Sequence, residues 1–588
     1  MTDRLTDLSR IADSMQGAYL SRRQMLKSTA VLSMGAALLA ACAEDDDDAG
    51  DDEDTGDEVS DDPAGGDAEE DDEDTDEAAE DEDEGDSEDT DAEEVSQEER
   101  SGGELQVALI GEPPTLDIHN TSATVTTHVT MHMYENLFTW DEEFQAIPEL
   151  VDTHEVSDDG LLNTLTLREG VMFHNGDEMT AEDVHASIDR WANVVGVGFG
   201  EELMGATEEM RVVDDYTLEF EMTEAFGTFV VVLARQNNGC AIYPQSIVSE
   251  IGTEDVPQPV GTGPYQFVEW QADQHIIVER FEDYVYRDEE PNGYGGRKHA
   301  YLDAIRFIPV PDEAARVSGL QAGDYHFLEE ISTDQFETLE GGENIVAEVG
   351  PPAGNDQIIM NMEQGLMTDV SMRRAVQAAI DADEILTAAW GEDYYRADPG
   401  HMWEETVWHT TVGEDLYNIG DPELAADYLE EAGYDGEPVR LITTEEYADM
   451  YSTAIVLEQQ LEDAGMTVEV QVFDWATLLE TRDDMAAWDL AITGFSFRVD
   501  PTQLPFMRCE WGGRWCSDEK VEIVNRLFSE VEFEDRFAAW EELQELIYEQ
   551  VPMVKTGEGL NLLTYSASMQ NVELTLLAPA YWNVWLEG

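Results

Sequence analysis

One acidic segment, residues 44–99, sets the limits of what this chain can fold into. It holds 35 Asp or Glu and no Lys or Arg, and most of its other residues are Ala, Gly, Ser and Thr. Like charges repel one another and almost no apolar side chain is present to be buried, so the segment cannot form a core. We therefore predict a disordered acidic linker over 43–100 that acts as a spacer, with calcium or partner binding as the alternative, and folding that begins near Gly103.

The remaining chain is acidic as well. Residues 101–588 carry 97 Asp or Glu against 22 Lys or Arg, a formal charge of −75, and the whole chain has four lysines. Such a surface repels nucleic acid and anionic membranes, so neither is expected as a binding partner. It also repels itself unless salt screens the charges, over about 3 Å at 1 M. The pattern resembles proteins of salt-loving archaea.

Three export signals follow one another in residues 1–42. Arg22 and Arg23, within SRRQMLK, resemble a twin-arginine motif with Met25 where Phe is usual. The apolar run that follows, 29–41, is shorter than the ~20 residues that span a bilayer and suits a signal peptide. It ends in LAAC, which resembles a lipobox with Cys42 as the lipidated residue. We predict a twin-arginine lipoprotein signal that leaves the body lipid-anchored on the extracellular face of the cytoplasmic membrane.

Strand and helix patterns alternate between residues 437 and 493. Strands are expected at 439–443, 468–472 and 488–493, with helices at 452–464 and 475–486 between them. This β-α-β-α-β order predicts parallel strands, and ligands of such sheets bind beyond the carboxyl ends of the strands. The loop 494–501 follows one of these ends and offers two aromatic side chains, an arginine and an aspartate.

Eight segments, in order between residues 113 and 381, resemble the family 5 solute-binding proteins of ABC importers, whose members bind peptides, nickel or oligosaccharides. The matching segments are PPTLD at 113–117, YENLF at 134–138, LREGVMFHNG at 167–176, MTAEDV at 179–184, VGTGPY at 260–265, GLQAGDY at 319–325, Asn361, and RRAVQAAID at 373–381. The segments at 167–184 match the family most closely, spacing included.

The residues after 179 also predict a helix by themselves. Thr180 and Asp183 form a capping box at its start. Val184, Ile188 and Trp191 then repeat at i, i+4 and i+7, which predicts one buried stripe.

The resemblance implies an α/β fold of two lobes, the periplasmic-binding-protein type II, cluster C arrangement with an inserted subdomain. Lobe I would comprise 101–350 and 557–588, with the subdomain near 145–255, and lobe II would comprise 351–556. It further implies a monomeric binding protein that is not an enzyme and needs no cofactor. A solute, with peptide as first choice, would be trapped between the lobes and passed to ABC permease and ATPase subunits.

The resemblance also suggests binding residues. Asp500, before Pro501, would pair with the α-amino group of a peptide through a charge-assisted hydrogen bond, or it would only start a turn. Arg498 would bind a ligand carboxylate or pair with a surface acid. The aromatic side chains that could line the cleft are Phe495, Phe497, Trp488, Trp511, Trp515, Trp403 and Trp408. For each of them, packing in the core is the alternative.

The cysteines and histidines leave other options open. Cys509 and Cys516 flank a Trp- and Gly-rich loop and are expected to form a disulfide outside the cell, whereas Cys240 has no partner. His128 and His132 lie four residues apart, and His401 and His409 raise the same question of a metal, but neither pair has a completing ligand nearby, so no metal site is predicted. Oligosaccharide or nickel-chelate binding remains an alternative, as does a hydrolase or a sensory surface protein on the same scaffold.

The predicted anchor can be tested by a single substitution. Cys42→Ser removes the thiol that would carry the lipid, so we expect the protein to be released into the soluble fraction of cells that export it. Fractionation and immunoblotting would measure the release. A Cys42→Ser protein that stays fully membrane-bound would refute the anchor.

The charge of −75 predicts that folding depends on salt. In dilute buffer the Debye length lengthens to about 10 Å at 0.1 M, so acidic side chains repel one another over a longer range. We expect cooperative thermal unfolding, followed by circular dichroism, in molar KCl and loss of the folded state in dilute buffer. An ordinary melting curve at low salt would contradict this prediction.

Overall fold

The computed structural model describes residues 100–573 and 577–587. The predicted export signal with Arg22 and Arg23, the predicted lipidation site Cys42, and the linker up to residue 99 lie outside the described residues. No helix in the described ranges is long and apolar enough to cross a membrane.

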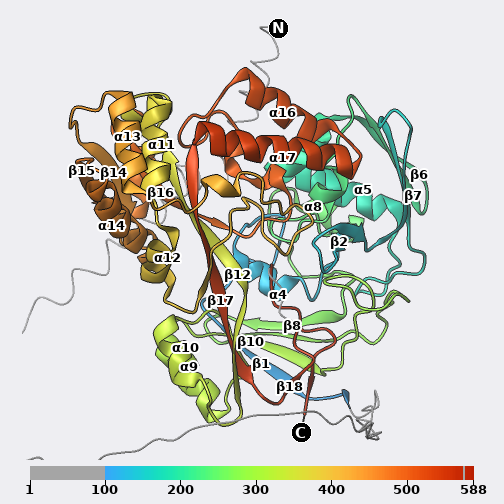
Figure 1. Cartoon of the computed structure of the whole chain (residues 1–588). Helices are drawn as coiled ribbons and strands as arrows, with labels where there is room; N and C mark the ends of the chain where they lie inside the picture. The colour runs from blue at the N-terminus through green and yellow to red at the C-terminus, as the bar shows by residue number, and fades with distance from the viewer. Residues whose placement is uncertain (1–99, 574–576, 588) are drawn as a thin grey trace, which may run out of the picture. The chain divides into compact units, whose positions relative to one another are not determined.

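Two long strands hold the described chain together. β12 (Ile345–Met360) and β17 (Met553–Ser566) pair antiparallel, from Ile345 opposite Ser566 to Ile359 opposite Met553. They lie in the middle of an 11-stranded sheet, whose order within the described residues is β15-β14-β16-β12-β17-β11-β1-β10-β9-β8, with β13 joined to β17. In Figure 1 the pair runs through the centre of the drawing and links two groups of elements.

The first group surrounds one end of the pair. β14 and β15 are parallel, β14 is parallel to β16, and β16 is antiparallel to β12. The bounds of β14, β15 and β16 are Val439–Thr444, Val468–Phe473 and Leu490–Ser496. The helices of this group are α11 (Val370–Ala379), α12 (Ala382–Trp390), α13 (Pro422–Ala432), α14 (Ala448–Asp463), α15 (Trp475–Asp483), α16 (Asp518–Ser529) and α17 (Phe533–Gln550).

The second group surrounds the other end. Its strands are β1 (Glu104–Leu109), β8 (Tyr265–Gln271), β9 (His275–Arg280), β10 (Ala304–Pro309) and β11 (Phe327–Leu328). The helices here are α4 (Thr124–Thr130), α9 (Glu313–Ala322) and α10 (Thr333–Leu339). β1 is parallel to β10 and β11, and β11 is antiparallel to β17, so residues from both ends of the described chain share this part of the sheet.

A separate four-stranded sheet, in the order β4-β5-β7-β6, lies within the range predicted for the subdomain. Its strands are Val151–Val156, Leu162–Leu167, Thr217–Met222 and Thr207–Asp214. Helix α5 (Ala181–Asp189) begins with the predicted capping box, in which the Thr180 backbone N–H donates to Asp183 Oδ2 at 2.8 Å. The predicted stripe of Val184, Ile188 and Trp191 is fully buried.

Smaller elements complete the described fold. They are β2 (Phe138–Trp140), β3 (Ala146–Pro148), the π-helix η2 (Arg190–Val195), α6 (Gly198–Gly205), α7 (Phe229–Leu233), α8 (Gln245–Ile251), η3 (Leu366–Thr368), β13 (Tyr395–Arg396), η4 (Glu414–Leu416), η5 (Pro501–Gln503), η6 (Pro505–Met507), β18 (Met569–Gln570) and β19 (Trp585–Leu586).

The predicted β-α-β-α-β pattern is confirmed, with shifted ends. The first helix begins four residues earlier than expected, at Ala448, and the last strand runs to Ser496 instead of residue 493. The predicted lobe boundaries, near 350 and 557, fall inside β12 and β17, so the chain passes between the lobes in extended strands. The boundaries themselves stay predictions.

Candidate functional site

Phe497 joins the two predicted lobes. It lies directly after β16, on the loop that the sequence singled out, and its ring centroid is 4.8 Å from that of Phe144 and 5.2 Å from that of Trp403. Phe144 belongs to predicted lobe I, whereas Trp403 belongs to lobe II. All three side chains are buried. The loop beyond the carboxyl end of β16 is therefore covered by residues from the opposite lobe, where a ligand of an α/β sheet is expected.

Backbone hydrogen bonds also join the two predicted lobes. The Gly227 backbone N–H donates to the Phe528 carbonyl oxygen at 2.9 Å, which ties the subdomain to α16. The Val407 N–H points to the Glu143 carbonyl oxygen at 3.4 Å. The lobes thus touch at several points away from β12 and β17.

Two half-buried arginines, one beside Phe497 and one in predicted lobe I, have few partners. Arg498 follows Phe497 and donates to the carbonyl oxygen of that residue at 2.9 Å. Arg235, just after α7, has its guanidinium carbon 3.8 Å from the centre of the Phe199 ring. Within the described ranges, neither guanidinium has a carboxylate in salt-bridge contact. Burial lowers the pKa of both groups, and the charge of Arg498 helps to lower the pKa of Arg235 to about 9.

A buried ion network holds the segment that carries Trp403. Lys555, on β17, lies 3.0 Å from Asp398 Oδ2 and 2.7 Å from Glu558 Oε1. Arg396 bridges Glu558 and Glu405, with an Nε–Oε2 distance of 2.8 Å to Glu558. Charged groups removed from water are stable only when they are paired in this way. The network therefore fixes the otherwise irregular stretch around residues 396–409 to β17.

His409 belongs to the same network. Its Nε2 lies 2.8 Å from Asp398 Oδ1, and this hydrogen bond raises the pKa of His409. Burial alone would raise the pKa of Asp398, but the hydrogen bond from His409 and the charge of Lys555 hold it below its usual value. His401 is buried instead beside Phe506 and Tyr548. The two histidines thus have different neighbours.

Asp500 has a partner inside the protein. Its carboxylate is 1% exposed and accepts from Arg536 of α17, with Nη2 2.9 Å from Oδ2 and 3.0 Å from Oδ1. Asp500 Oδ1 also accepts from the Thr502 backbone N–H at 3.0 Å, so Asp500 caps η5. The guanidinium in turn lies 4.8 Å from the centre of the Trp408 ring. The role of Asp500 in binding an amine stays a prediction, and in this structure the carboxylate forms a buried ion pair.

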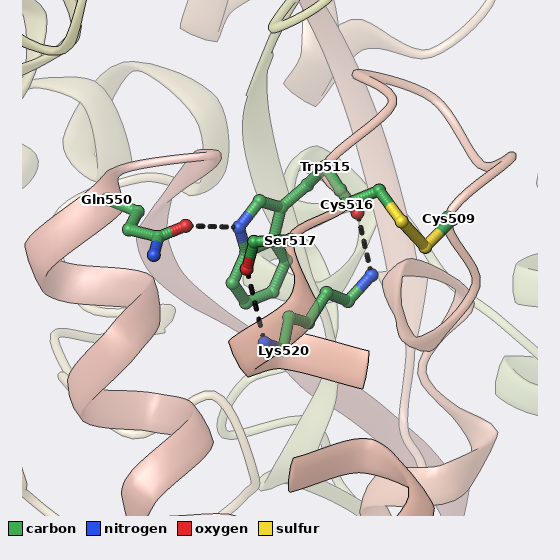
Figure 2. The surroundings of a disulfide bond; sticks show 6 residues. All are labelled: Cys509, Trp515, Cys516, Ser517, Lys520 and Gln550. Carbon is green, nitrogen blue, oxygen red and sulfur yellow. Dashed lines mark hydrogen bonds between the residues drawn. A yellow bond between two sulfur atoms is a disulfide. The ribbon is translucent and has the colours of Figure 1, made fainter. Parts of the chain in front are cut away.

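The predicted disulfide between Cys509 and Cys516 is present. Figure 2 shows that the adjoining residues are tied to helices α17 and α16: Trp515 Nε1 donates to Gln550 Oε1 at 2.8 Å, and Lys520 Nζ donates to the Trp515 carbonyl oxygen at 2.9 Å. Lys520 is fully buried, and burial lowers its pKa to about 7. The Trp515 indole N–H is therefore already bonded within lobe II.

The remaining predicted aromatics differ in their surroundings. Trp488 is fully buried and donates to the Arg482 carbonyl oxygen at 3.0 Å, as expected of a core residue. Trp408 packs against Phe533 and Phe537. Phe495 and Trp511 contact each other, with ring centroids 5.5 Å apart. Among the described residues, no ring contact joins Trp488, Trp408, Phe495 or Trp511 to predicted lobe I. Phe497 is the predicted aromatic residue whose ring contacts that lobe, at Phe144.

The histidines that were considered as metal ligands, and the unpaired cysteine, have ordinary surroundings. His128 Nδ1 contacts Glu329, and His132 is buried and stacks on Tyr581 with ring centroids 5.1 Å apart. Cys240 is a buried free thiol. No group of three or more His, Cys, Asp or Glu that could hold a metal ion occurs among the described residues.

The sequence analysis missed three residues: Phe144, which meets Phe497; Arg536, which pairs with Asp500; and Arg235, which stacks on Phe199. They come from segments far from the loop 494–501, so local periodicity cannot reveal them. The one available signal was the scarcity of positive charge in residues 101–588, which makes each arginine next to apolar residues noteworthy. Arg235 follows the apolar run of α7 and was open to that argument.

Replacing Asp500 tests whether its carboxylate serves the fold or the ligand. Asp500→Asn leaves Arg536 buried without its counter-charge, which costs about 3–5 kcal/mol when a buried pair is broken. Denaturant unfolding in molar salt would measure this loss. The control is Glu542→Gln, which removes the exposed partner of Arg526 and should cost about 1 kcal/mol or less. Full stability of Asp500→Asn combined with weakened ligand binding would favour the ligand role instead.

The sequence comparisons agree with this architecture. The model of the bacterial extracellular solute-binding proteins, family 5, matches residues 145–510. The chain is 28% identical over 482 residues to a "probable peptide ABC transporter periplasmic-binding protein" of Sinorhizobium fredii, covering 79% of this chain and 90% of that protein. It is 27% identical over 361 residues to a glutathione-binding protein of Pectobacterium atrosepticum, covering 61% and 67%.

Solved structures share the two-lobe fold. An ABC transporter substrate-binding protein from Listeria monocytogenes superimposes with a TM-score of 0.73 at 20% identity, covering 83% of this chain and 99% of that one. A periplasmic binding protein from Helicobacter pylori, in complex with the peptide STSA, gives a TM-score of 0.67 at 20% identity over 84% and 100%. With its family model matched over most of the folded chain, the protein belongs to the extracellular solute-binding proteins of family 5.

Proposed function

We propose that this protein captures peptides outside the cell and delivers them to the permease and ATPase subunits of an ABC importer. The observation that carries the proposal is the junction at Phe497, where Phe144 of lobe I meets the loop beyond the carboxyl end of β16. Peptide is favoured over other solutes because the Sinorhizobium fredii relative, aligned over 90% of its length, is named as a peptide-binding protein.

Capture would proceed by opening and closing about β12 and β17. Their ladder is irregular between Val349 and Pro352, between Pro352 and Gly354, and between Asn355 and Gln357. Such breaks let a strand pair bend, which suits a hinge. Gly354 also allows the close approach of β16, because a Cβ there would lie 2.5 Å from the Phe495 carbonyl oxygen.

The contacts at Phe497 belong to a closed arrangement. The cavity found inside lobe I, lined by Thr127, Glu149 and Lys298 among others, measures about 30 Å³, room for one or two waters. A peptide needs several hundred cubic ångströms, so this cavity cannot hold one, and the proposal places the solute between the lobes instead. A ligand then favours closure by as much as it binds the closed form more tightly than the open one.

Export and anchoring complete the proposal. The twin-arginine signal would carry the body across the membrane, and lipid on Cys42 would hold it there by the acidic linker. An anchored receptor would stay near its permease while the lobes above the linker open and close.

A peptide titration in molar KCl tests the function. We expect at least one member of a pool of defined di- and tripeptides to raise the melting temperature, since ligand at 100 times its Kd stabilises the native state by about 2.7 kcal/mol. Phe497→Leu removes the ring that meets Phe144 and should weaken binding at least about tenfold, or 1.4 kcal/mol, by calorimetry.

Tyr286→Ala serves as the control, because Tyr286 is 45% exposed and lies away from the loop 494–501 in sequence. Its affinity for the same peptide should match that of the unmodified protein. Stabilisation by oligosaccharides but by no peptide would overturn the proposed solute class, and turnover of a bound peptide would show an enzyme instead.

A further inference from the structure

A small polar cavity lies inside predicted lobe I, apart from the junction between the lobes. It measures about 30 Å³, which leaves room for one ion or for one or two waters. Its polar lining includes Thr127 of helix α4, together with Glu149, Gln236 and Lys298. All of these residues belong to one predicted lobe, so an occupant of this cavity would be part of the fold and not the captured solute.

Oxygen atoms at this cavity lack partners. Thr127 is 3% exposed, and its hydroxyl oxygen has no hydrogen-bond partner among the described residues. The buried side-chain oxygen of Gln236 is likewise unpaired there, and so is Oε2 of Glu135, whose chain neighbours Tyr134 and Asn136 line the cavity. Buried polar atoms without partners are rare and costly. Several of them at one cavity indicate an occupant supplied from solvent.

The charges beside the cavity do not balance. Glu135 and Glu149 are 3% and 5% exposed, and Lys298 is the one lysine that contacts them in the described structure. Lys298 Nζ contacts Glu149 and lies 3.7 Å from Glu135 Oε1, which also accepts from the Tyr284 hydroxyl at 2.8 Å. Buried charges are stable only when they are compensated. Two carboxylates with one ammonium group leave one negative charge without a counter-charge in contact.

The nearest arginines do not supply that counter-charge. Arg168 and Arg287 reach Glu149, but both donate to its backbone carbonyl oxygen, at 3.5 and 2.9 Å. Burial raises the pKa of the Glu149 carboxyl to about 7, and the charge of Glu135 adds to the effect. Near neutral pH the excess charge is therefore compensated either by a proton on Glu149 or by a cation.

We propose that this cavity binds one alkali-metal cation, with Thr127 Oγ1, Gln236 Oε1 and a carboxylate oxygen of Glu149 among its ligands. Hard cations take carboxylate, hydroxyl and carbonyl oxygens of this kind. A singly charged ion matches the one uncompensated carboxylate, whereas a divalent ion would leave excess positive charge beside Lys298. The cation would connect helix α4 to the segments that carry Glu149 and Gln236, whichever solute the lobes capture.

High salt would then stabilise the protein in two separable ways. Screening of the charge of −75 depends on ionic strength and not on which cation supplies it. A cation site depends on the identity of the ion, and an ion that binds only the folded state stabilises that state. Choline carries a trimethylammonium group that is too large for a cavity of about 30 Å³. Alkali chlorides and choline chloride at equal molarity therefore separate the two effects.

The first experiment measures thermal unfolding of the full chain in molar KCl, NaCl and choline chloride, at a pH above the raised pKa of Glu149. We expect a higher melting temperature in at least one alkali chloride than in choline chloride. Thr127→Val should lose most of this difference, because it removes a proposed ligand that has no other partner in the described structure. The control Thr126→Val removes a hydrogen bond to the Thr115 carbonyl oxygen on the same helix, and should lower the melting temperature equally in all three salts.

Glu149→Gln tests the charge of the site. We expect this variant to lose the difference between alkali chloride and choline chloride. Glu542→Gln removes the same charge at an exposed position and should keep the difference. In the unmodified protein the difference should shrink as the pH falls below about 7, because a proton on Glu149 then replaces the cation. Glu149→Gln should show no such pH dependence.

Rubidium, a heavier alkali cation, makes the occupant directly visible. Crystals of the full chain grown from RbCl should show an anomalous scattering peak in the cavity beside Thr127 and Glu149, and crystals of Thr127→Val should show a weaker one. Water alone in the cavity, without an anomalous signal, would overturn the inference. So would equal melting temperatures in alkali and choline chloride, or a difference that persists in both variants. None of these results bears on peptide capture between the lobes.

Discussion

The antiparallel ladder between β12 and β17 is the interaction on which the rest of the structure depends. It joins the two groups of elements, and each strand also positions part of the junction. β12 pairs with β16, with Asn355 opposite Phe495, and so determines where the loop carrying Phe497 emerges. β17 supplies Lys555 and Glu558, whose network holds the segment of Trp403. Loss of this strand pairing would therefore separate the lobes and also displace Phe497 and Trp403 from each other.

Positive charge is scarce in this chain, and much of it is used inside the protein. Lys298, Lys520 and Lys555, the lysines of the described residues, are 4%, 0% and 2% exposed. Arg190 pairs with buried Asp117, and Arg536 pairs with buried Asp500. Buried pairs contribute little net stability but are expensive to break, so they fix one arrangement against others. Acidic residues therefore dominate the surface, whereas several of the few basic side chains form buried ion pairs that hold segments of the fold together.

The sequence predicted local features well and long-range contacts poorly. Alternation and capping sufficed for the strands and helices between 437 and 496 and for the start of α5, because periodicity within one element records which face is buried. Two cysteines seven residues apart sufficed for the disulfide. The pairing of Asp500 with Arg536 spans 36 residues, and the rings of Phe144 and Phe497 meet from different predicted lobes. Such contacts arise from how whole elements are stacked, which no local pattern encodes.

The burial of the described lysines has a practical consequence for the chemist who handles this protein. Lys298 and Lys555 are locked in ion pairs, and Lys520 is covered by the ring of Trp515. Amine-directed reagents, such as succinimidyl dyes, biotinylating esters and the usual cross-linkers, require an accessible primary amine. The native folded region offers these reagents no accessible lysine among its described residues. Attachment there is better directed at carboxyl groups, and a lysine that does become labelled would report local opening of the fold.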